Sequence, residues 1–473
     1  MLRRALAVAA CAALAGGLVD AAPAVSATRP GPSARVVRDT LLDPSGIYFV
    51  SYDGLVNQNP FQMSGILTYG GYQYVAWYHA DRYVKIARRR APEGAWQTIT
   101  LPHQLTTDDS HNVISMGISP RDGRIHIAMD THNTPVFYVK SVAGLANHPA
   151  TWDASDFGPV QQTLDGLDLG NITYPQFIVT PEKKLQFVYR TGQGSGNGVN
   201  RLAEYDGGTW RQVGTWSSAT GNYTANGVTS TTRNMYVHGL DYGPDGRLSV
   251  AFTWREGNQG VLCAPGGLDN HDIGYVYSDD RGRTWRNSAG QAVGATGTAP
   301  VSIDAPGLTV DPIGVDRGLI NQEGQAVDSA GDPHVIESYV PAEAKSCVTN
   351  YVADRTAYGR DYHLWRDSSG TWHKTQIPVP LNATGRSKIV FDRDDNAYVI
   401  MPFGRVVAAS RASGWTDWKV LYDAKTLNAF GEVDVDASRL RSQGLLSFMY
   451  QQKSTGTTPS AVRVIDFRIG ARR

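Results

Sequence analysis

The feature that most constrains the fold is a recurring unit in which a tight polar turn is followed by a short alternating apolar run. Alternation with a period of two is typical of strands, so each unit predicts a β-hairpin. About seven units follow one another, roughly 45–85 residues apart. The turns lie at residues 69–71, 120–123, 181–183, 243–246, 329–332, 392–395 and 438–443.

This spacing predicts an all-β fold, a seven-bladed β-propeller with one four-stranded sheet per unit. With 50 Gly, 24 Pro and 19% charged residues, the composition suits a turn-rich β protein better than a helical bundle or a disordered chain. Residues 278–285, Ser-Asp-Asp-Arg-Gly-Arg-Thr-Trp, fit an Asp-box, in which an Asp caps a hairpin turn and a Trp packs between strands. Since an Asp-box is structural, it supports the fold and carries no chemistry.

The first 27 residues are predicted to be a secretory signal peptide. Arg3 and Arg4 precede a short apolar run at 5–19, and Val25-Ser26-Ala27 offers small residues for cleavage. The run is too short for a transmembrane anchor, which needs about 20 apolar residues. We therefore expect a secreted protein with an N-terminal extension at 28–44 and a single propeller domain at 45–473.

Charge and cysteine content limit the partners. The 44 Lys and Arg balance the 44 Asp and Glu, so we expect neither nucleic acid nor a membrane as a partner, and we expect a monomer. With Cys11 in the signal peptide, Cys263 and Cys347 could form one disulfide or remain separate thiols. Cys263 and His271 could also bind a metal, but two ligands are too few to predict a zinc site.

Polar residues gather at the open ends of neighbouring hairpins, because residues equidistant from an antiparallel turn face each other. In the second unit this pairs His111 with His132, and in the third it pairs Tyr174 with Arg190. These ends would surround one mouth of a propeller channel, where ligand sites are favoured. The same level also holds His79 in the first unit and, in the fourth, Arg233 and Asn234 opposite Trp254 and Arg255, with Tyr236 and His238 just inside.

These residue types suit β-elimination on a uronic acid. An Arg can pair with the carboxylate and stabilise the charge that develops when the C5 proton leaves. A Tyr or a neutral His can remove that proton, and a second such group can protonate the departing O4. Asp109 and Asp130 are expected to orient the two histidines, since no convincing close carboxylate pair for glycoside hydrolysis is present. His126, in mid-strand, is interpreted as structural.

At these residues the sequence resembles the secreted BNR-repeat propeller polysaccharide lyases, which include ulvan lyases and rhamnose–glucuronate lyases. The resemblance covers most of the chain from about residue 45 and implies eliminative cleavage of a bond to C4 of glucuronate or iduronate in a polysaccharide, giving an unsaturated uronate. The matching segments are Asp109-Ser110-His111-Asn112, Asp130-Thr131-His132-Asn133, Tyr174-Pro175-Gln176-Phe177, Tyr189-Arg190-Thr191-Gly192, and the stretch from Arg233 through His238 to Trp254-Arg255-Glu256.

The resemblance also implies roles for single residues. Arg190 would neutralise the carboxylate, Tyr174 would be the base, the acid or both, and His111 would be the alternative base or acid, supported by His132. No cofactor would be required, whereas a structural zinc or calcium ion stays open because the ligand set is incomplete. Arg233, His238 and Arg255 would bind substrate. Tyr236, Asn112 and His79 are further candidates for substrate binding.

Two other classes of function stay open. A sialidase-like Asp-box glycoside hydrolase would need an arginine triad and a Tyr–Glu pair, and the early Arg-Ile-Pro strand of sialidases is absent. A non-catalytic carbohydrate-binding propeller would not need Tyr174 opposite Arg190. The sequence leaves open which polysaccharide is cut and whether cleavage is internal or at chain ends.

Overall fold

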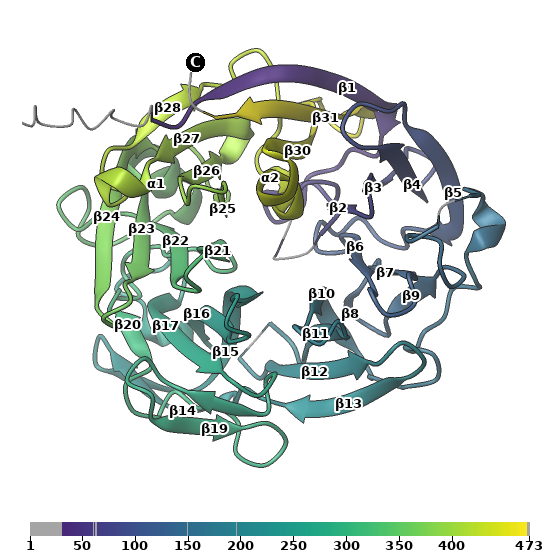
Figure 1. Ribbon diagram of the computed structural model, residues 1–473. Coiled ribbons are helices and arrows are strands. Elements are labelled where there is room, and N and C mark those ends of the chain that lie inside the picture. The colour runs from purple at the N-terminus through teal and green to yellow at the C-terminus, as the bar shows by residue number, and fades with distance from the viewer. Residues whose placement is uncertain (1–30, 60, 62–63, 149, 195, 471–473) are drawn as a thin grey trace, which may run out of the picture.

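The computed structural model describes residues 31–470 apart from 60, 62–63, 149 and 195, and its sheets are arranged in a ring (Figure 1). In this part of the chain the strands form seven sheets. The prediction of an all-β fold is confirmed, since the helices here are two short α-helices, α1 (Tyr351–Tyr358) and α2 (Ala437–Gln443), and four 3-10 turns. None of these helices is long and apolar enough to cross a membrane.

The first three sheets contain the first three predicted hairpins, whose first strands β2, β6 and β10 lie towards the centre of the ring (Figure 1). Their strands are β2 (Ile66–Tyr69), β3 (Tyr72–Tyr78), β4 (Tyr83–Arg90) and β5 (Gln97–Gln104) in the first; β6 (Ser115–Ile118), β7 (Ile125–Met129) and β9 (Phe137–Lys140) in the second; and β10 (Ile172–Val179), β11 (Leu185–Thr191), β12 (Val199–Tyr205) and β13 (Trp210–Thr215), with β8 (His132–Thr134) beside β10, in the third.

The fourth sheet is the largest, and the fifth and sixth have four strands each. The fourth contains β14 (Thr220–Ala225), β15 (Val228–Tyr242), β16 (Leu248–Glu256), β17 (Asn270–Ser278), β18 (Thr284–Arg286), β19 (Ala292–Ala295) and β20 (Thr309–Asp311); the fifth contains β21 (Gly324–Val327), β22 (Pro333–Tyr339), β23 (Arg360–Arg366) and β24 (Trp372–Pro380); and the sixth contains β25 (Lys388–Phe391), β26 (Ala397–Met401), β27 (Arg405–Ala409) and β28 (Lys419–Tyr422).

The last sheet closes the ring by joining strands from opposite ends of the chain. It consists of β29 (Asp434–Val435), β30 (Leu445–Gln451), β31 (Ser460–Ile469) and β1 (Ala34–Gly46). Ala34 pairs with Ile469 and Gly46 pairs with Ser460. Residues 34–44, expected to precede the propeller, therefore belong to this sheet. The predicted signal peptide at 1–27 lies outside the described residues.

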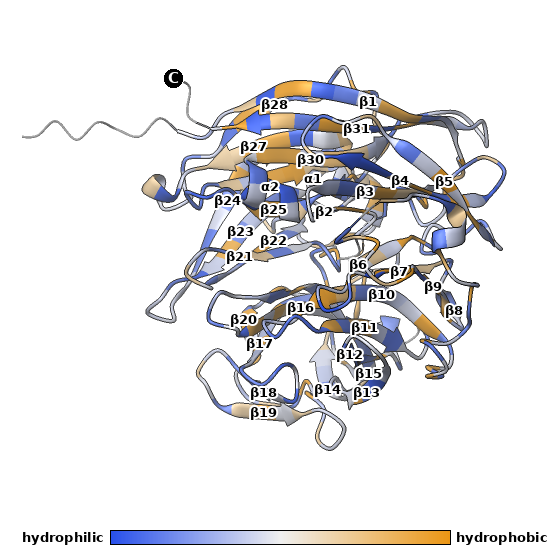
Figure 2. Ribbon diagram, turned by 45° about the vertical axis from the view of Figure 1, so that its right-hand side comes forward, coloured by the Kyte–Doolittle hydropathy of each residue, from blue (hydrophilic) through white to orange (hydrophobic). Residues whose placement is uncertain are grey.

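Apolar side chains from adjacent sheets pack together and hold the ring in place. Ile86 of the first sheet and Ile127 of the second are fully buried and belong to one apolar cluster, and Figure 2 shows the apolar segments along the strands. The Asp-box forms as expected, because Asp280 accepts hydrogen bonds from the backbone N–H groups of Arg283 and Thr284 at 3.1 and 2.8 Å. The structural interpretation of His126 is also confirmed, since it is fully buried beside the Tyr138 hydroxyl.

Candidate functional site

A pocket of about 230 Å³ lies where loops that precede several inner strands converge. Its lining includes His111, Tyr174 and Arg255, so residues from three successive predicted hairpins do share one hollow. Other loops complete it with Phe61, Asn321, Tyr351, Arg386 and Glu432.

The two histidines of the second hairpin meet as expected. The register of β6 and β7 pairs Ser115 with Ala128, which continues to His111 opposite His132. The two rings stack with centroids 4.4 Å apart. Asp109 holds both, with its oxygens 3.0 Å from Nδ1 of His111 and 2.6 Å from Nδ1 of His132. Asp130 does not orient either ring, because its carboxylate instead contacts His103 at 3.0 Å.

His111 is placed to act as a neutral imidazole. Since the Asp109 carboxylate can only accept a hydrogen bond, Nδ1 of His111 carries the proton and Nε2 has a lone pair. Phe61 stacks on the ring at 4.9 Å. Burial outweighs the stabilisation of the charged form by Asp109 and lowers the pKa of His111 to about 4. The ring is therefore an available proton acceptor at neutral pH.

Tyr174 and Arg190 also come together, with one local difference from the expected register. Thr173 pairs with Arg190, and a β-bulge before Gln176 shifts the register between them. Tyr174 lies in this bulge with a positive φ of 56°, a backbone conformation that re-aims a side chain. The guanidinium carbon of Arg190 lies 4.8 Å from the ring centre of Tyr174 and 5.2 Å from that of Tyr236.

Arg190 is a buried cation that lacks a carboxylate partner among the residues described. Its exposed fraction is 2%, and its Nε and Nη1 have no hydrogen-bond acceptor in this part of the chain. A buried charge is normally paired, because removing it from water is costly. The arrangement therefore favours binding of an anionic group from outside the protein.

The two tyrosines beside Arg190 differ in acidity. Burial raises the pKa of Tyr174, and the neighbouring Tyr236 raises it further, against the opposing effect of three arginines. For Tyr236, burial also acts to raise the pKa, but Arg190 and Arg255 outweigh it and lower the pKa overall. Tyr174 is thus held as a neutral phenol that can donate a proton.

Two arginines line the pocket, each with its own carboxylate, whereas Arg190 is not among the lining residues and contacts the lining residue Tyr174. Nε of Arg255 is 3.0 Å from Asp269, and Nη1 of Arg386 is 2.9 Å from Glu432. Arg386 was not predicted from the sequence, although it lies two residues before the inner strand β25, at the open end of the sixth hairpin. Extending the same hairpin geometry to the turn at 392–395 would have found it.

Arg233 is not brought to the pocket. It pairs across the sheet with Glu256 and not with Trp254, and its fully buried guanidinium forms an ion pair with that carboxylate at 2.9 Å. Successive side chains of a strand point to opposite faces of the sheet. Arg233 points to the face on which the Glu256 carboxylate lies. The expectation that Arg233 binds substrate therefore has no support in the geometry.

Three other residues expected to bind substrate also lie outside this pocket. Asn112 is buried, and its amide donates to the Thr107 hydroxyl. His79 contacts Asp43 at 2.7 Å. His238 lines a separate pocket of about 160 Å³. Tyr236 does not line the pocket either, but it contacts Arg190 and the lining residue Tyr174, with its ring centre 6.1 Å from that of Tyr174.

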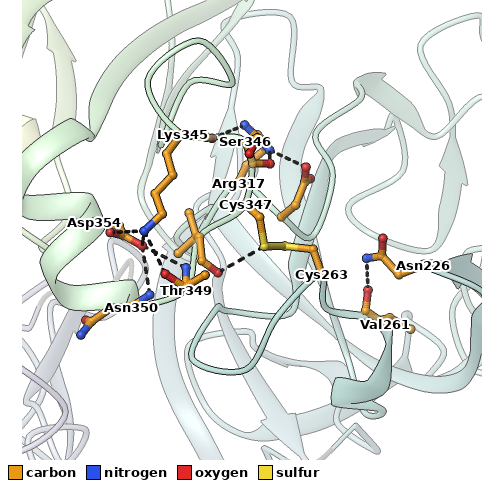
Figure 3. Close-up of a disulfide and its surroundings, with 12 residues drawn as sticks. Asn226, Val261, Cys263, Arg317, Lys345, Ser346, Cys347, Thr349, Asn350 and Asp354 are labelled. Atoms are coloured by element: carbon orange, nitrogen blue, oxygen red, sulfur yellow. Dashed lines mark hydrogen bonds and ion pairs between the residues drawn. A yellow bond between two sulfur atoms is a disulfide. The ribbon is translucent and has the colours of Figure 1, made fainter.

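Cys263 and Cys347 form a disulfide and are not separate thiols (Figure 3). The S–S distance is 2.01 Å. His271 contacts Glu256 and Asp272 at 2.9 and 3.2 Å, so Cys263 and His271 do not form a metal site. Within the described residues, Asp109, His111 and His132 have ligand atoms within 4.8 Å of one another. Since these groups already bond to each other, we assign no metal to them.

The comparisons with known proteins agree with this fold. The model of a family described as "BNR repeat-containing family member" matches residues 72–379. The long isoform of ulvan lyase from Pseudoalteromonas sp. (strain PLSV) is 24% identical over 456 residues, covering 85% of this chain and 42% of the relative. That of Alteromonas sp. (strain LOR) is 24% identical over 460 residues, with the same coverage. The chain therefore spans less than half the length of these curated relatives.

Two solved structures resemble the chain over nearly its whole length. The polysaccharide lyase Uly1 has a TM-score of 0.69 at 18% identity, covering 92% of this chain and 100% of that one. A PL25 ulvan lyase bound to -[GlcA(1-4)Rha3S]- has a TM-score of 0.62 at 14% identity, covering 92% of this chain and 96% of that one. At these identities the similarity shows a shared propeller-like fold.

Proposed function

Since the chain belongs to the BNR repeat-containing family, we propose that it is a polysaccharide lyase that cleaves a bond to C4 of a uronic acid by β-elimination. The observation that carries the proposal is Arg190, a buried guanidinium that no described carboxylate neutralises, beside Tyr174. The relatives named ulvan lyase support the reaction class. The saccharide bound to the PL25 ulvan lyase, in which glucuronate is linked to a 3-sulfated rhamnose, supports glucuronate linked to rhamnose as the substrate.

In the proposed mechanism Arg190, His111 and Tyr174 each have one chemical role. Arg190 pairs with the uronate carboxylate and stabilises the enolate-like charge that forms as the C5 proton leaves. His111 is neutral and accepts that proton at Nε2. Tyr174 donates its phenolic proton to O4 as the C4–O4 bond breaks and the C4–C5 double bond forms. Exchange with water then returns a proton to Tyr174 and removes one from His111.

The supporting residues follow from the same contacts. Asp109 fixes the tautomer of His111 and holds His132 against it. Tyr236 stacks on Arg190 and limits its orientation. Arg255 adds positive charge at the pocket, although Asp269 compensates part of it. The mechanism uses no cofactor.

One observation favours the glycoside hydrolase as the second candidate, because Arg190, Arg255 and Arg386 form a loose arginine triad. Arg255 and Arg386, however, have their own carboxylates, which leaves Arg190 as the cation best suited to a substrate carboxylate. Stacked histidines under Asp109 also suit proton transfer better than a Tyr–Glu nucleophile pair.

We further propose that each of the seven sheets is one blade of a propeller and that the chain is exported as a monomer. The Cys263–Cys347 disulfide supports export, because disulfides persist in oxidising compartments.

The test is to incubate the purified protein with ulvan, gum arabic, heparinoid and pectic substrates. A lyase gives an unsaturated uronate, which absorbs in the near ultraviolet. New reducing ends without that absorbance would identify a hydrolase. Binding without any product would identify a carbohydrate-binding protein.

A further inference from the structure

One wall of the pocket carries a polar pair that the proposed mechanism does not use. Arg386 and Glu432 lie before the inner strands β25 and β29 of the sixth and last sheets. Asn321 lies before β21 of the fifth sheet. We call these three residues the neutral wall, whereas His111, Tyr174 and Arg255 come from the second to fourth sheets.

Hydrogen bonds fix the neutral wall in one arrangement. Nη1 and the backbone N–H of Arg386 both donate to Oε1 of Glu432 at 2.9 Å. Nε and Nη2 of Arg386 donate to the carbonyl and side-chain oxygens of Asn321 at 2.7 and 3.0 Å. A Cβ at position 385 would lie 2.9 Å from Cγ of Glu432, so Gly385 permits this close approach.

The second oxygen of Glu432 is left without a donor. Glu432 is 6% exposed, and its Oε2 has no hydrogen-bond donor within the described part of the chain. An unsatisfied buried carboxylate oxygen is costly and uncommon in folded proteins. Glu432 lines the pocket while Oε2 itself is covered, so a small rotation of the side chain would let a hydroxyl group of a bound ligand supply the missing donor.

The charges of Glu432 and Arg386 determine which ligand groups can bind at the neutral wall. Glu432 compensates Arg386, so the pair carries no net charge, unlike Arg190 beside Tyr174. A sulfate or second carboxylate beside Glu432 would meet a like charge, which is unfavourable at close range. A sugar hydroxyl instead donates to Oε2 and can accept from the guanidinium.

We propose that the neutral wall is a subsite for an unsulfated, hydroxyl-bearing sugar unit next to the uronate, with Glu432 Oε2 accepting a sugar hydroxyl. The assignment of the neighbouring unit as a uronate rests on the proposed function. The subsite makes the protein selective for polysaccharides in which this neighbouring sugar carries no anionic substituent.

The test measures binding separately from turnover. Ulvan oligosaccharides, as isolated and after chemical desulfation, are titrated calorimetrically into Tyr174→Phe protein, so that cleavage does not interfere. The desulfated form is expected to bind more tightly. Adding Glu432→Gln to this variant is expected to weaken binding of the desulfated form about tenfold, because one hydrogen bond to a charged group is lost. Binding of the sulfated form is expected to weaken less.

Glu182→Gln in the same background is the matched control, since Glu182 pairs with Arg281 away from the pocket and should leave both affinities unchanged. If Glu432→Gln fails to fold, Glu432→Asp keeps the charge opposite Arg386 while withdrawing Oε2, and the same loss is expected. Tighter or equal binding of the sulfated form, no binding of either form, or equal losses for both overturns the subsite. Absence of an unsaturated product from the wild type refutes the lyase activity instead.

Discussion

At the scale of single residues, Arg190 and Arg233 show how surroundings decide what a guanidinium can do. Both are buried at the ends of neighbouring hairpins, and both were predicted to contact the substrate. Arg233 is held by Glu256, so its charge is already compensated. Arg190 lies between two phenol rings with no such partner, so it is the one poised to hold an anion.

Replacing Tyr174 by Phe removes the proposed proton donor while keeping the ring that stacks on Arg190. General acid catalysis typically contributes about 10²–10⁴-fold, so kcat should fall by that factor while the melting temperature stays near that of the wild type. Initial rates of ultraviolet absorbance measure the loss. Tyr358→Phe, on the exposed side of α1, is the control. Turnover close to that of the wild type in Tyr174→Phe would remove Tyr174 from the mechanism.

The acid limb of the pH profile should report His111. A base works only when neutral, and burial lowers the pKa of His111 to about 4. The value of kcat/KM should therefore stay high as pH falls through 6.5, the ordinary pKa of histidine, and decline only as pH approaches about 4. The measurement is kcat/KM against pH on protein checked for folding at each pH. A decline centred near pH 6.5 would contradict the assignment of His111 as base.

At the scale of elements, the disulfide joins two loops that both reach the pocket. Cys263 lies in the loop between β16 and β17, and Cys347 precedes α1 (Figure 3). The backbone N–H of Tyr351 donates to the Gly266 carbonyl at 2.8 Å. Leu268 and Tyr351, at the ends of these loops, line the pocket. The covalent link therefore holds one side of the site.

Replacing both cysteines by serine should weaken the protein and the site together. The bond closes a loop with a sequence separation of 84 residues, and loss of such a link typically costs about 2–5 kcal/mol of unfolding free energy. We expect a KM several-fold higher, because Leu268 and Tyr351 are held less firmly, with a smaller change in kcat. Denaturant unfolding and steady-state kinetics measure both.

Reduction provides the control for the disulfide. Treating the wild type with a thiol reductant should reproduce both changes, and the double serine variant should not respond to it. An unchanged KM in the double variant would show that the loops keep their positions without the bond.

At the scale of the whole molecule, buried neutral histidines should make the fold sensitive to acid. Burial lowers the pKa of His126 to about 3 and that of His363 well below its ordinary value. Both groups bind protons more readily in the unfolded chain. The stability that they contribute is therefore present above about pH 6.5 and is lost as pH falls towards the folded pKa values.

Thermal unfolding between pH 7 and pH 4 should show this as a falling melting temperature. His126→Asn should lower the melting temperature at pH 7 and flatten its decline in acid, because one of the groups is gone. The exposed His148 is the matched control, since His148→Asn should leave the decline unchanged. A decline equally steep in both variants would show that other groups cause the acid sensitivity.

The sequence predicted more of the fold than of the site, for a physical reason. Turn residues and apolar alternation are local signals, so the hairpins, the Asp-box and the meetings of His111 with His132 and of Tyr174 with Arg190 followed from spacing. Whether a side chain is compensated depends on distant partners. Hence the pairing of Arg386 with Glu432, the contact of Asp130 with His103 and the ion pair of Arg233 with Glu256 could not be obtained from hairpin geometry alone.

The pairing of β1 with β31 has a mechanical consequence. The two strands are antiparallel, and Ala34 lies opposite Ile469. A force that pulls these two points apart would therefore peel the strands open one hydrogen bond at a time, instead of straining the whole ladder at once. Under tension the ring of sheets would open first between β1 and β31. A covalent bond between these two strands would keep the ring closed.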